Sequence, residues 1–209
     1  MQKIYVFDLD GTLADSMPLA VQLTLDVLDE YGIVYPDNIV DITMPMGFRG
    51  VAEYFSTQLG VPLTAEQIYA IFTNRLKEAY EKDILLKPHV KETLEALKAQ
   101  GARLNVLTAT AYTLMAPCLQ RNGILHLFEN VWSAEDFQLA KSNTRIYQAV
   151  AERLGVTTAE YVMVDDNVQV LQTARRAGVY TIGMHDSFSK ESVVRAACDR
   201  YIYTFDELL

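Results

Sequence analysis

A short apolar run that leads straight into an acidic turn constrains this chain most. The run, Ile4-Tyr5-Val6-Phe7, is rich in β-branched and aromatic residues and too short for a helix, so we expect a buried strand. The turn that follows reads Asp8-Leu9-Asp10-Gly11-Thr12-Leu13. Because ligands bind at the carboxyl ends of strands in an open α/β sheet, Asp8 and Asp10 are predicted to face one crevice there.

Two close carboxylates repel each other, which raises a pKa unless a cation lies nearby. Such a pair is therefore usually bound to a metal ion or divided into an acid and a base. Gly11 permits the tight backbone that the turn needs. A strand end followed by a solvated Asx-type turn is the alternative interpretation of Asp-x-Asp-Gly taken alone.

The composition is that of an ordinary globular protein, and its charge limits the partners. The 209 residues suffice for one sizeable core, or for one core and a small second domain. With 18 basic and 27 acidic residues the formal net charge is −9, so neither nucleic acid nor an anionic membrane is expected as a partner. A small anionic substrate would need a local metal ion or a few cations to offset this charge.

Cysteine usage and hydropathy bear on location. Cys118 and Cys198 lie far apart and form no CxxC motif, which suits a reducing cytosol and argues against a zinc site. The sequence shows no signal-peptide pattern and no apolar run near ~18 residues. We therefore expect a soluble, cytoplasmic protein that acts as a monomer or weak dimer.

Helical patterns dominate after the first acidic turn. A helix is predicted between about Ser16 and Tyr31. We interpret Met44–Gly50 as a loop leading into a second helix. The pattern Thr64-Ala65-Glu66-Gln67 is a capping box that opens the next helix. No strand pattern interrupts this region. Residues 15–85 are therefore predicted to form a helical cap inserted between the first and second strands.

From Lys87 onward, strand and helix patterns alternate. The predicted strands are 104–107, 130–132, 161–164, 179–184 and 201–203, with helices over 112–122, 144–154 and 168–177 among them. Such alternation indicates an α/β fold with a doubly wound parallel sheet and right-handed crossovers. Residues 1–14 and 86–209 are thus predicted to form an α/β catalytic core.

Three of the predicted strands end in polar, reactive side chains, which the parallel sheet would bring to one edge. They are Asp8 with Asp10, Thr108, and Asp165 with Asp166. Lys141 is the nearest lysine that could join them. Carboxylate oxygens select Mg²⁺ over softer metals, and a hydroxyl, backbone amides and an ammonium group suit a phosphoryl group. A carboxylate nucleophile that forms an aspartyl-phosphate is an established route for its transfer.

These motifs resemble those of the haloacid dehalogenase-like (HAD) hydrolase superfamily, in its phosphatase branch with a helical cap. Asp8–Leu13 matches the first motif in full, and Asp165-Asp166 followed by Ala174–Gly178 matches the fourth motif in its double-acid form. Thr108 matches the second motif. Lys141 matches the third, although the prolines that the family usually has at the positions of Ser142 and Thr144 are absent.

The resemblance implies a role for each acid. Asp8 would be the nucleophile, and Asp10 would protonate the leaving oxygen and then act as base on the hydrolytic water. Mg²⁺ would be held by the Asp8 side chain, the Asp10 backbone carbonyl and Asp166, with Asp165 a direct or an outer ligand. The alternative for Asp165 is that it only caps the N-terminus of the helix predicted over 168–177.

The resemblance also implies how the phosphoryl group is held. Thr108, Ala109 and Lys141 would bind it, although Thr108 could simply end a strand and Lys141 could be a solvated lysine at a helix start. Arg49 is the sole cation between Lys3 and Arg75 and lies in the predicted glycine-containing cap loop. We expect Arg49 to face the substrate, and a surface arginine is the alternative.

Sequence differences from relatives that have other activities favour a phosphatase. Dehalogenase relatives lack the acid that is present here as Asp10. Phosphonatase relatives need a lysine in the cap, and residues 4–76 contain none. Sugar phosphomutase relatives typically carry a histidine in the region that reads Asp15–Ala20 here, which has none. We therefore expect a Mg²⁺-dependent phosphatase acting on a small phosphorylated metabolite, such as phosphoglycolate or a sugar phosphate. The alternatives are a sugar phosphomutase and a non-catalytic or receiver-like phosphoacceptor protein.

Overall fold

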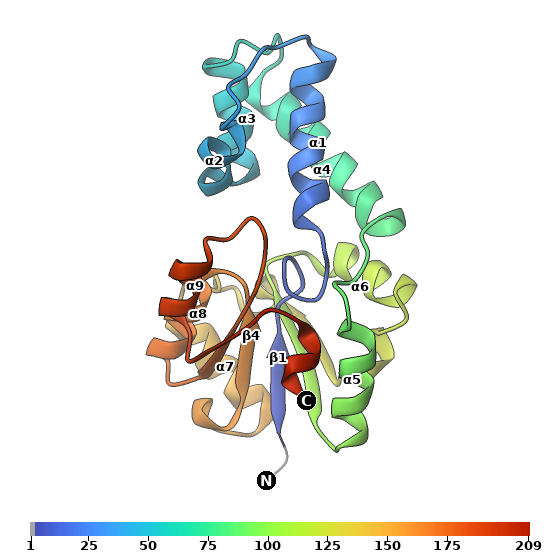
Figure 1. Ribbon diagram of the computed structural model, residues 1–209, viewed down its shortest axis with the longest axis vertical. Coiled ribbons are helices and arrows are strands. Elements are labelled where there is room, and N and C mark those ends of the chain that lie inside the picture. The colour runs from blue at the N-terminus through green and yellow to red at the C-terminus, as the bar shows by residue number, and fades with distance from the viewer. Residues whose placement is uncertain (1–2) are drawn as a thin grey trace. The chain divides into compact units, whose positions relative to one another are not determined.

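A six-stranded, all-parallel sheet with the order β3-β2-β1-β4-β5-β6 organises the computed structural model, which describes residues 3–209 (Figure 1). The strands are β1 (Ile4–Phe7), β2 (Arg103–Thr108), β3 (Asn130–Ser133), β4 (Val162–Asp165), β5 (Tyr180–Met184) and β6 (Arg200–Ile202). All four residues of β1 are buried, because β1 lies between β2 and β4. The apolar opening run therefore forms a buried strand, as predicted, and the structure places it inside the sheet.

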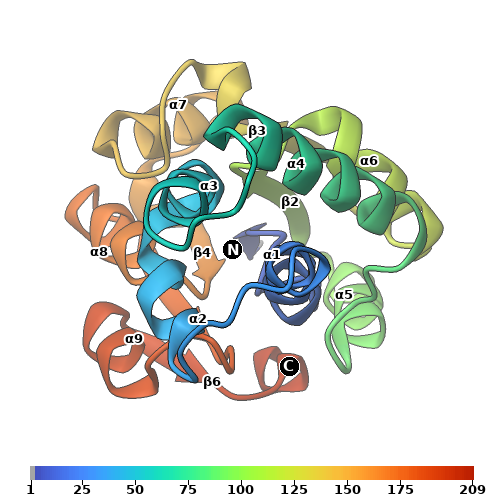
Figure 2. The ribbon, with the colours of Figure 1, turned by 90° about the horizontal axis from the view of Figure 1, so that it is seen from above.

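Helices cover both faces of this sheet. Figure 2 shows α5 (Val90–Ala99) and α6 (Tyr112–Arg121) on one side and α7 (Thr144–Leu154), α8 (Val168–Arg176) and α9 (Glu191–Ala197) on the other. Short 3₁₀ helices connect them: η2 (Leu125–Leu127), η3 (Ala134–Phe137), η4 (Thr158–Glu160) and η5 (Phe205–Leu208). This arrangement confirms the predicted doubly wound α/β fold.

Apolar side chains on β1, β4 and α7 pack between the sheet and the helices on one face. Val6, Met163, Ile146 and Val150 are fully buried in that cluster, which fixes α7 against the sheet. Burial of such side chains contributes roughly 1.5–3 kcal/mol each. The core thus supports the loops that follow the carboxyl ends of the strands.

The chain divides into two compact units. One is made of the chain up to Ser16 together with Ile84–Leu209, and the other is Met17–Asp83. The elements of the second unit are all helical: α1 (Met17–Glu30), α2 (Ile39–Thr43), η1 (Met44–Met46), α3 (Gly47–Thr57) and α4 (Ala65–Lys82). Nowhere in the described part of the chain is there a helix with the length and apolar character to cross a membrane.

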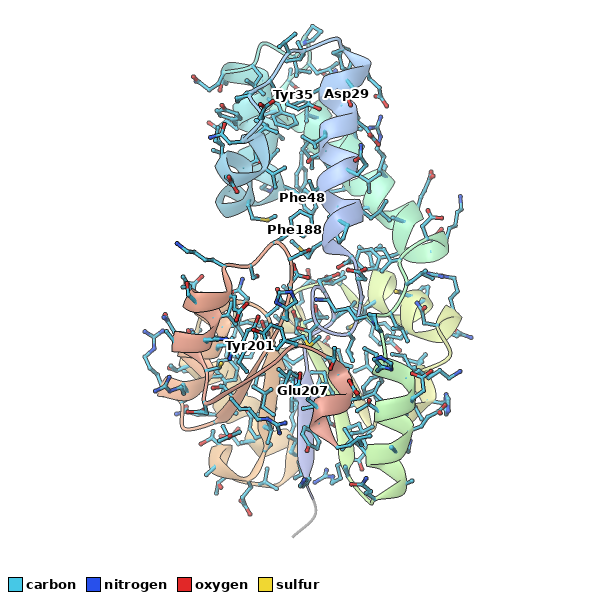
Figure 3. The ribbon with its side chains drawn as sticks, viewed as in Figure 1. Asp29, Tyr35, Phe48, Phe188, Tyr201 and Glu207 are labelled. Atoms are coloured by element: carbon cyan, nitrogen blue, oxygen red, sulfur yellow. The ribbon has the colours of Figure 1, made fainter. Side chains whose placement is uncertain are left out.

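The helical unit has a core of its own. Val27, Phe55 and Phe72 are among its buried side chains, and the rings of Phe55 and Phe72 meet edge to face with centroids 5.9 Å apart. Thr64 forms the predicted capping box at the start of α4. Beyond α1, the Tyr35 hydroxyl donates to Asp29 Oδ1 at 3.1 Å, and both residues are labelled in Figure 3.

One local prediction was wrong, and a short helix was missed. Residues 47–50 are not a loop, because α3 begins at Gly47, so Arg49 stands in the first turn of a helix. Gly47, at φ 63°, turns the chain where the helix begins. Gly50 lies within the helix, where a Cβ would come 2.9 Å from Met46 Cβ. The glycines thus serve a turn and a close contact. The sequence analysis also missed α9, which spans only seven residues.

His89, the residue before α5, adopts the left-handed conformation with φ 65°. A residue with a side chain loses of order 1 kcal/mol of stability when its backbone adopts the left-handed conformation, and glycine avoids this strain. We expect His89→Gly to raise the free energy of unfolding by about 0.5 kcal/mol or more, measured by urea denaturation at pH 8. The control is Gly155→Ala: Gly155 has φ 73° and open space around a built Cβ, so its substitution should lower stability through backbone strain alone. A less stable His89→Gly protein would contradict the strain argument.

Candidate active site

Three buried carboxylates gather at the carboxyl ends of β1 and β4. Asp8, Asp165 and Asp166 each offer one oxygen, and these oxygens lie within 4.8 Å of one another. The sheet register explains the meeting, because Phe7 pairs with Val164 and the Asp8 amide donates to the Val164 carbonyl at 2.9 Å. Two short sequence segments therefore place their acids side by side.

Lys141, in the segment between η3 and α7, lies against this group of carboxylates. Its Nζ is 2.7 Å from Asp8 Oδ1 and 2.7 Å from Asp165 Oδ2. The Tyr147 hydroxyl donates to the Lys141 carbonyl at 2.7 Å, which holds the segment in place. Burial alone would lower the pKa of Lys141, but the carboxylates of Asp165 and Asp8 outweigh it and hold that pKa above its usual range. The ammonium group is therefore charged.

One ammonium group does not neutralise three buried carboxylates. Burial raises the pKa of Asp8 to about 7, with Lys141 opposing the rise and Asp165 and Asp10 adding to it. Burial, followed by Asp165 and Asp8, raises the pKa of Asp166 well above its usual range. Asp8 Oδ1 is buried and accepts no hydrogen bond from the described residues, although Lys141 lies beside it as an ion partner. This all-oxygen donor set with excess negative charge fits a hard divalent cation.

Asp10 is held separately, by two hydroxyl groups. Ser16 Oγ donates to Asp10 Oδ1 at 2.7 Å, and Thr110 Oγ1 donates to Asp10 Oδ2 at 2.6 Å. Thr108 is the last residue of β2, and its hydroxyl accepts from the Thr110 amide at 3.2 Å. Ala109, between the two threonines, is exposed. The Asp10 carboxylate therefore has an orientation set by Ser16, just before α1, and by Thr110 in the loop after β2.

Arg49 belongs to the helical unit and is exposed there. Its guanidinium carbon lies 4.2 Å from the centroid of the Tyr69 ring on α4, a cation–π contact. The structure thus brings Asp8, Asp165, Asp166 and Lys141 into one group and connects Asp10 to Thr108 through Thr110.

The sequence analysis missed three hydroxyl groups that orient the acids. Ser16 was considered only as the approximate start of a helix, and Thr110 was not singled out although it follows Thr108 at a strand end. Thr12 lies inside the first motif, is fully buried and donates to Asp166 Oδ1 at 3.0 Å. Asn167, rather than Asp165, caps α8, since its side chain accepts from the amides of Gln169 and Val170. Asp165 Oδ1 instead accepts from the Asn167 amide at 2.8 Å.

Gly11 is required at its position for two reasons. Its φ of 73° lies in the left-handed region, and a Cβ there would come within 2.6 Å of Asp166 Oδ2. The glycine therefore allows the first motif to approach the fourth closely enough for their carboxylates to share one site.

The fold is a parallel α/β sheet with buried acids and a lysine at the carboxyl ends of its strands, which is the arrangement of an α/β protein with a ligand site at that edge. Comparison with known proteins identifies the family. The family model described as haloacid dehalogenase-like hydrolase matches residues 5–184. A phosphoglycolate phosphatase from Salmonella typhi is 30% identical, and the alignment covers 97% of this chain and 89% of that protein. The chain therefore belongs to the haloacid dehalogenase-like hydrolases, and its phosphatase relatives place it in the phosphatase branch, among phosphoric monoester hydrolases.

Solved structures agree with this fold. A predicted phosphoglycolate phosphatase from Haemophilus somnus 129pt superposes with a TM-score of 0.84 at 24% identity, covering 99% of this chain and 96% of that chain. CbbY from Rhodobacter sphaeroides, in a complex with phosphate, gives a TM-score of 0.77 at 22% identity, covering 100% of this chain and 96% of that chain. The similarity extends over both units of the chain.

We expect Gly11→Ala to displace the Asp166 carboxylate, because the new Cβ would overlap it. The affinity for a divalent cation, titrated as Mg²⁺ by calorimetry, should fall at least about tenfold, equivalent to ~1.4 kcal/mol. Gly178→Ala is the control: Gly178 also has positive φ, at 88°, but its Cβ would face Thr158 Oγ1 at 3.2 Å, outside the carboxylate group. Equal metal affinity in both variants would refute the close-approach argument.

Proposed function

We propose that this protein hydrolyses a small phosphate monoester through an aspartyl-phosphate on Asp8, with Mg²⁺ as cofactor. The observation that carries the proposal is the buried Asp8 carboxylate, at the end of the central strand, between the Lys141 ammonium group and the carboxylates of Asp165 and Asp166. The family membership supports the hydrolytic outcome. Mg²⁺ would be held by Asp8, Asp166 and the Asp10 backbone carbonyl, with Asp165 as a direct or outer ligand. The ion would supply positive charge to the phosphoryl oxygens.

In the first step an Asp8 carboxylate oxygen attacks phosphorus and the P–O ester bond breaks. Asp10 donates its proton to the departing oxygen, so the alcohol leaves neutral. In the second step Asp10 takes a proton from water, whose oxygen attacks the phosphorus of the aspartyl-phosphate and releases inorganic phosphate. Asp8 is restored as a carboxylate and Asp10 as an acid, which completes the cycle.

Other side chains orient the reacting groups. Ser16 and Thr110 hold the two oxygens of Asp10, so the acid keeps one orientation between the two steps. Lys141, together with Thr108 and the amide of Ala109, would bind the phosphoryl oxygens. The charge of Lys141 also offsets Asp8 and Asp165, which makes a negatively charged substrate acceptable in an acidic site.

The substrate is proposed to be a small phosphorylated metabolite. The Salmonella typhi relative is a phosphoglycolate phosphatase, and its alignment spans nearly all of this chain. Phosphoglycolate carries a carboxylate besides the phosphoryl group, and Arg49 of the helical unit would be the cation that recognises such a second anionic group. We propose that the helical unit acts as a cap that selects the substrate in this way.

Asp8→Asn is expected to lower phosphatase turnover by several orders of magnitude, because an amide cannot form the aspartyl-phosphate. Phosphate release from an aryl phosphate, with and without Mg²⁺, is the measurement. Glu152→Gln, on the exposed side of α7, is the matched control for loss of one negative charge and should keep full activity. Near-original turnover in the Asp8→Asn protein would exclude Asp8 as the nucleophile.

Asp10 and Asp166 should respond differently to the same change. Asp10→Asn removes the acid and base but keeps the backbone carbonyl, so turnover should fall by about 10²–10⁴-fold while Mg²⁺ affinity changes little. The fall should be larger for an alkyl phosphate than for an activated aryl phosphate, which leaves with little protonation. Asp166→Asn should weaken Mg²⁺ binding and slow both esters alike. If both variants lose metal affinity equally and Asp10→Asn shows no leaving-group dependence, Asp10 is only another ligand.

A further inference from the structure

A second buried ion pair, between Lys87 and Asp186, lies outside the residues given roles above. Lys87 Nζ is 2.8 Å from Asp186 Oδ2 and also donates to the His185 carbonyl at 2.7 Å. The exposed fraction is 8% for Lys87 and 3% for Asp186. A buried ion pair adds little net stability relative to apolar side chains of similar volume. Stability alone therefore does not account for these two charges.

Both partners are fixed by further contacts. Asp186 Oδ1 accepts from the amide of Phe188, a residue labelled in Figure 3, so the carboxylate is held by the loop after β5. The Lys87 amide donates to the Leu13 carbonyl at 2.9 Å, which joins it to the chain directly after the first motif. The ion pair thus connects the segment that follows Asp8 and Asp10 to the loop after β5.

The position of Asp186 brings its charge toward the carboxylate group. β5 is the neighbour of β4 in the sheet, with Gly183 paired to Asp165, and Asp186 follows the end of β5. Asp186 contributes to the rise in the pKa of Asp166, after burial, Asp165 and Asp8. A cavity of about 260 Å³ borders both Lys87 and Asp186, so solvent moderates the interaction. Lys87 Nζ lies 2.8 Å from Asp186 Oδ2, so its positive charge opposes the negative charge that Asp186 places at this strand end.

We propose that Lys87 and Asp186 are positioning residues that set the charge around Asp166 and thereby the affinity of the site for Mg²⁺. The inference rests on the proposed function, because it concerns the cation that the proposed reaction needs. Asp186 adds negative charge after the end of β5, the strand next to β4, and the ammonium group of Lys87 limits that charge. Together they keep cation binding strong without leaving an unpaired buried carboxylate.

The test is calorimetric titration of Mg²⁺ into the full chain without substrate. Lys87→Met removes the positive charge and keeps the length of the side chain, so Mg²⁺ should bind about three- to tenfold more tightly. Asp186→Asn removes the negative charge and keeps the acceptor for the Phe188 amide, so binding should weaken by a similar factor. The double variant should return close to the original affinity, and Lys87→Arg, which keeps the charge, should match the original protein.

The controls separate charge from structure. Arg103 and Glu129 form an ion pair at the start of β2, far along the strand from its carboxyl end, with Arg103 Nε 2.8 Å from Glu129 Oε2. Arg103→Met and Glu129→Gln should leave Mg²⁺ affinity unchanged, and circular dichroism should show folded protein throughout. If the original protein binds no Mg²⁺, the proposed function fails. If it binds Mg²⁺ but Lys87→Met and Asp186→Asn shift the affinity in the same direction, or not at all, the pair is purely structural and the inference is wrong.

Discussion

The electrostatic balance at the carboxyl ends of β1 and β4 governs the rest of the site. Three buried carboxylates face one lysine, so the group retains excess negative charge. Such an arrangement survives inside a protein only if a cation or protons compensate it. The same excess suits the group to a hard cation, and in the proposed reaction such a cation would allow a phosphate ester to approach Asp8.

The loop geometry around the acids follows from this balance. Gly11 lets the first motif come close to Asp166, and Thr12 donates to the same carboxylate. Ser16 and Thr110 each donate a hydrogen bond to one oxygen of Asp10, whereas Lys141 lies beside Asp8. Two acids separated by one residue in the sequence thus acquire different surroundings, which is the condition for different chemical roles.

The helical unit adds a second level of organisation. Its core of apolar side chains, including Val27, Phe55 and Phe72, is separate from the core under the sheet. Both segments that join it to the sheet unit pass the same point, where the Asp15 amide donates to the Leu85 carbonyl and the Lys87 amide to the Leu13 carbonyl. The chain therefore leaves the sheet unit and returns to it beside the first motif.

The sequence by itself determined the strands, most helices and which polar residues stand at the strand ends, because apolar runs, alternation and capping patterns are local properties of the chain. The start of α3 at Gly47 and the short α9 escaped it, since glycines in a helix and a seven-residue helix carry weak local signals. Only the tertiary structure decided which groups surround the acids. Thr110 reaches Asp10 across 100 residues and Lys87 reaches Asp186 across 99, and such pairs depend on how the strands align and the loops pack, which no local pattern encodes.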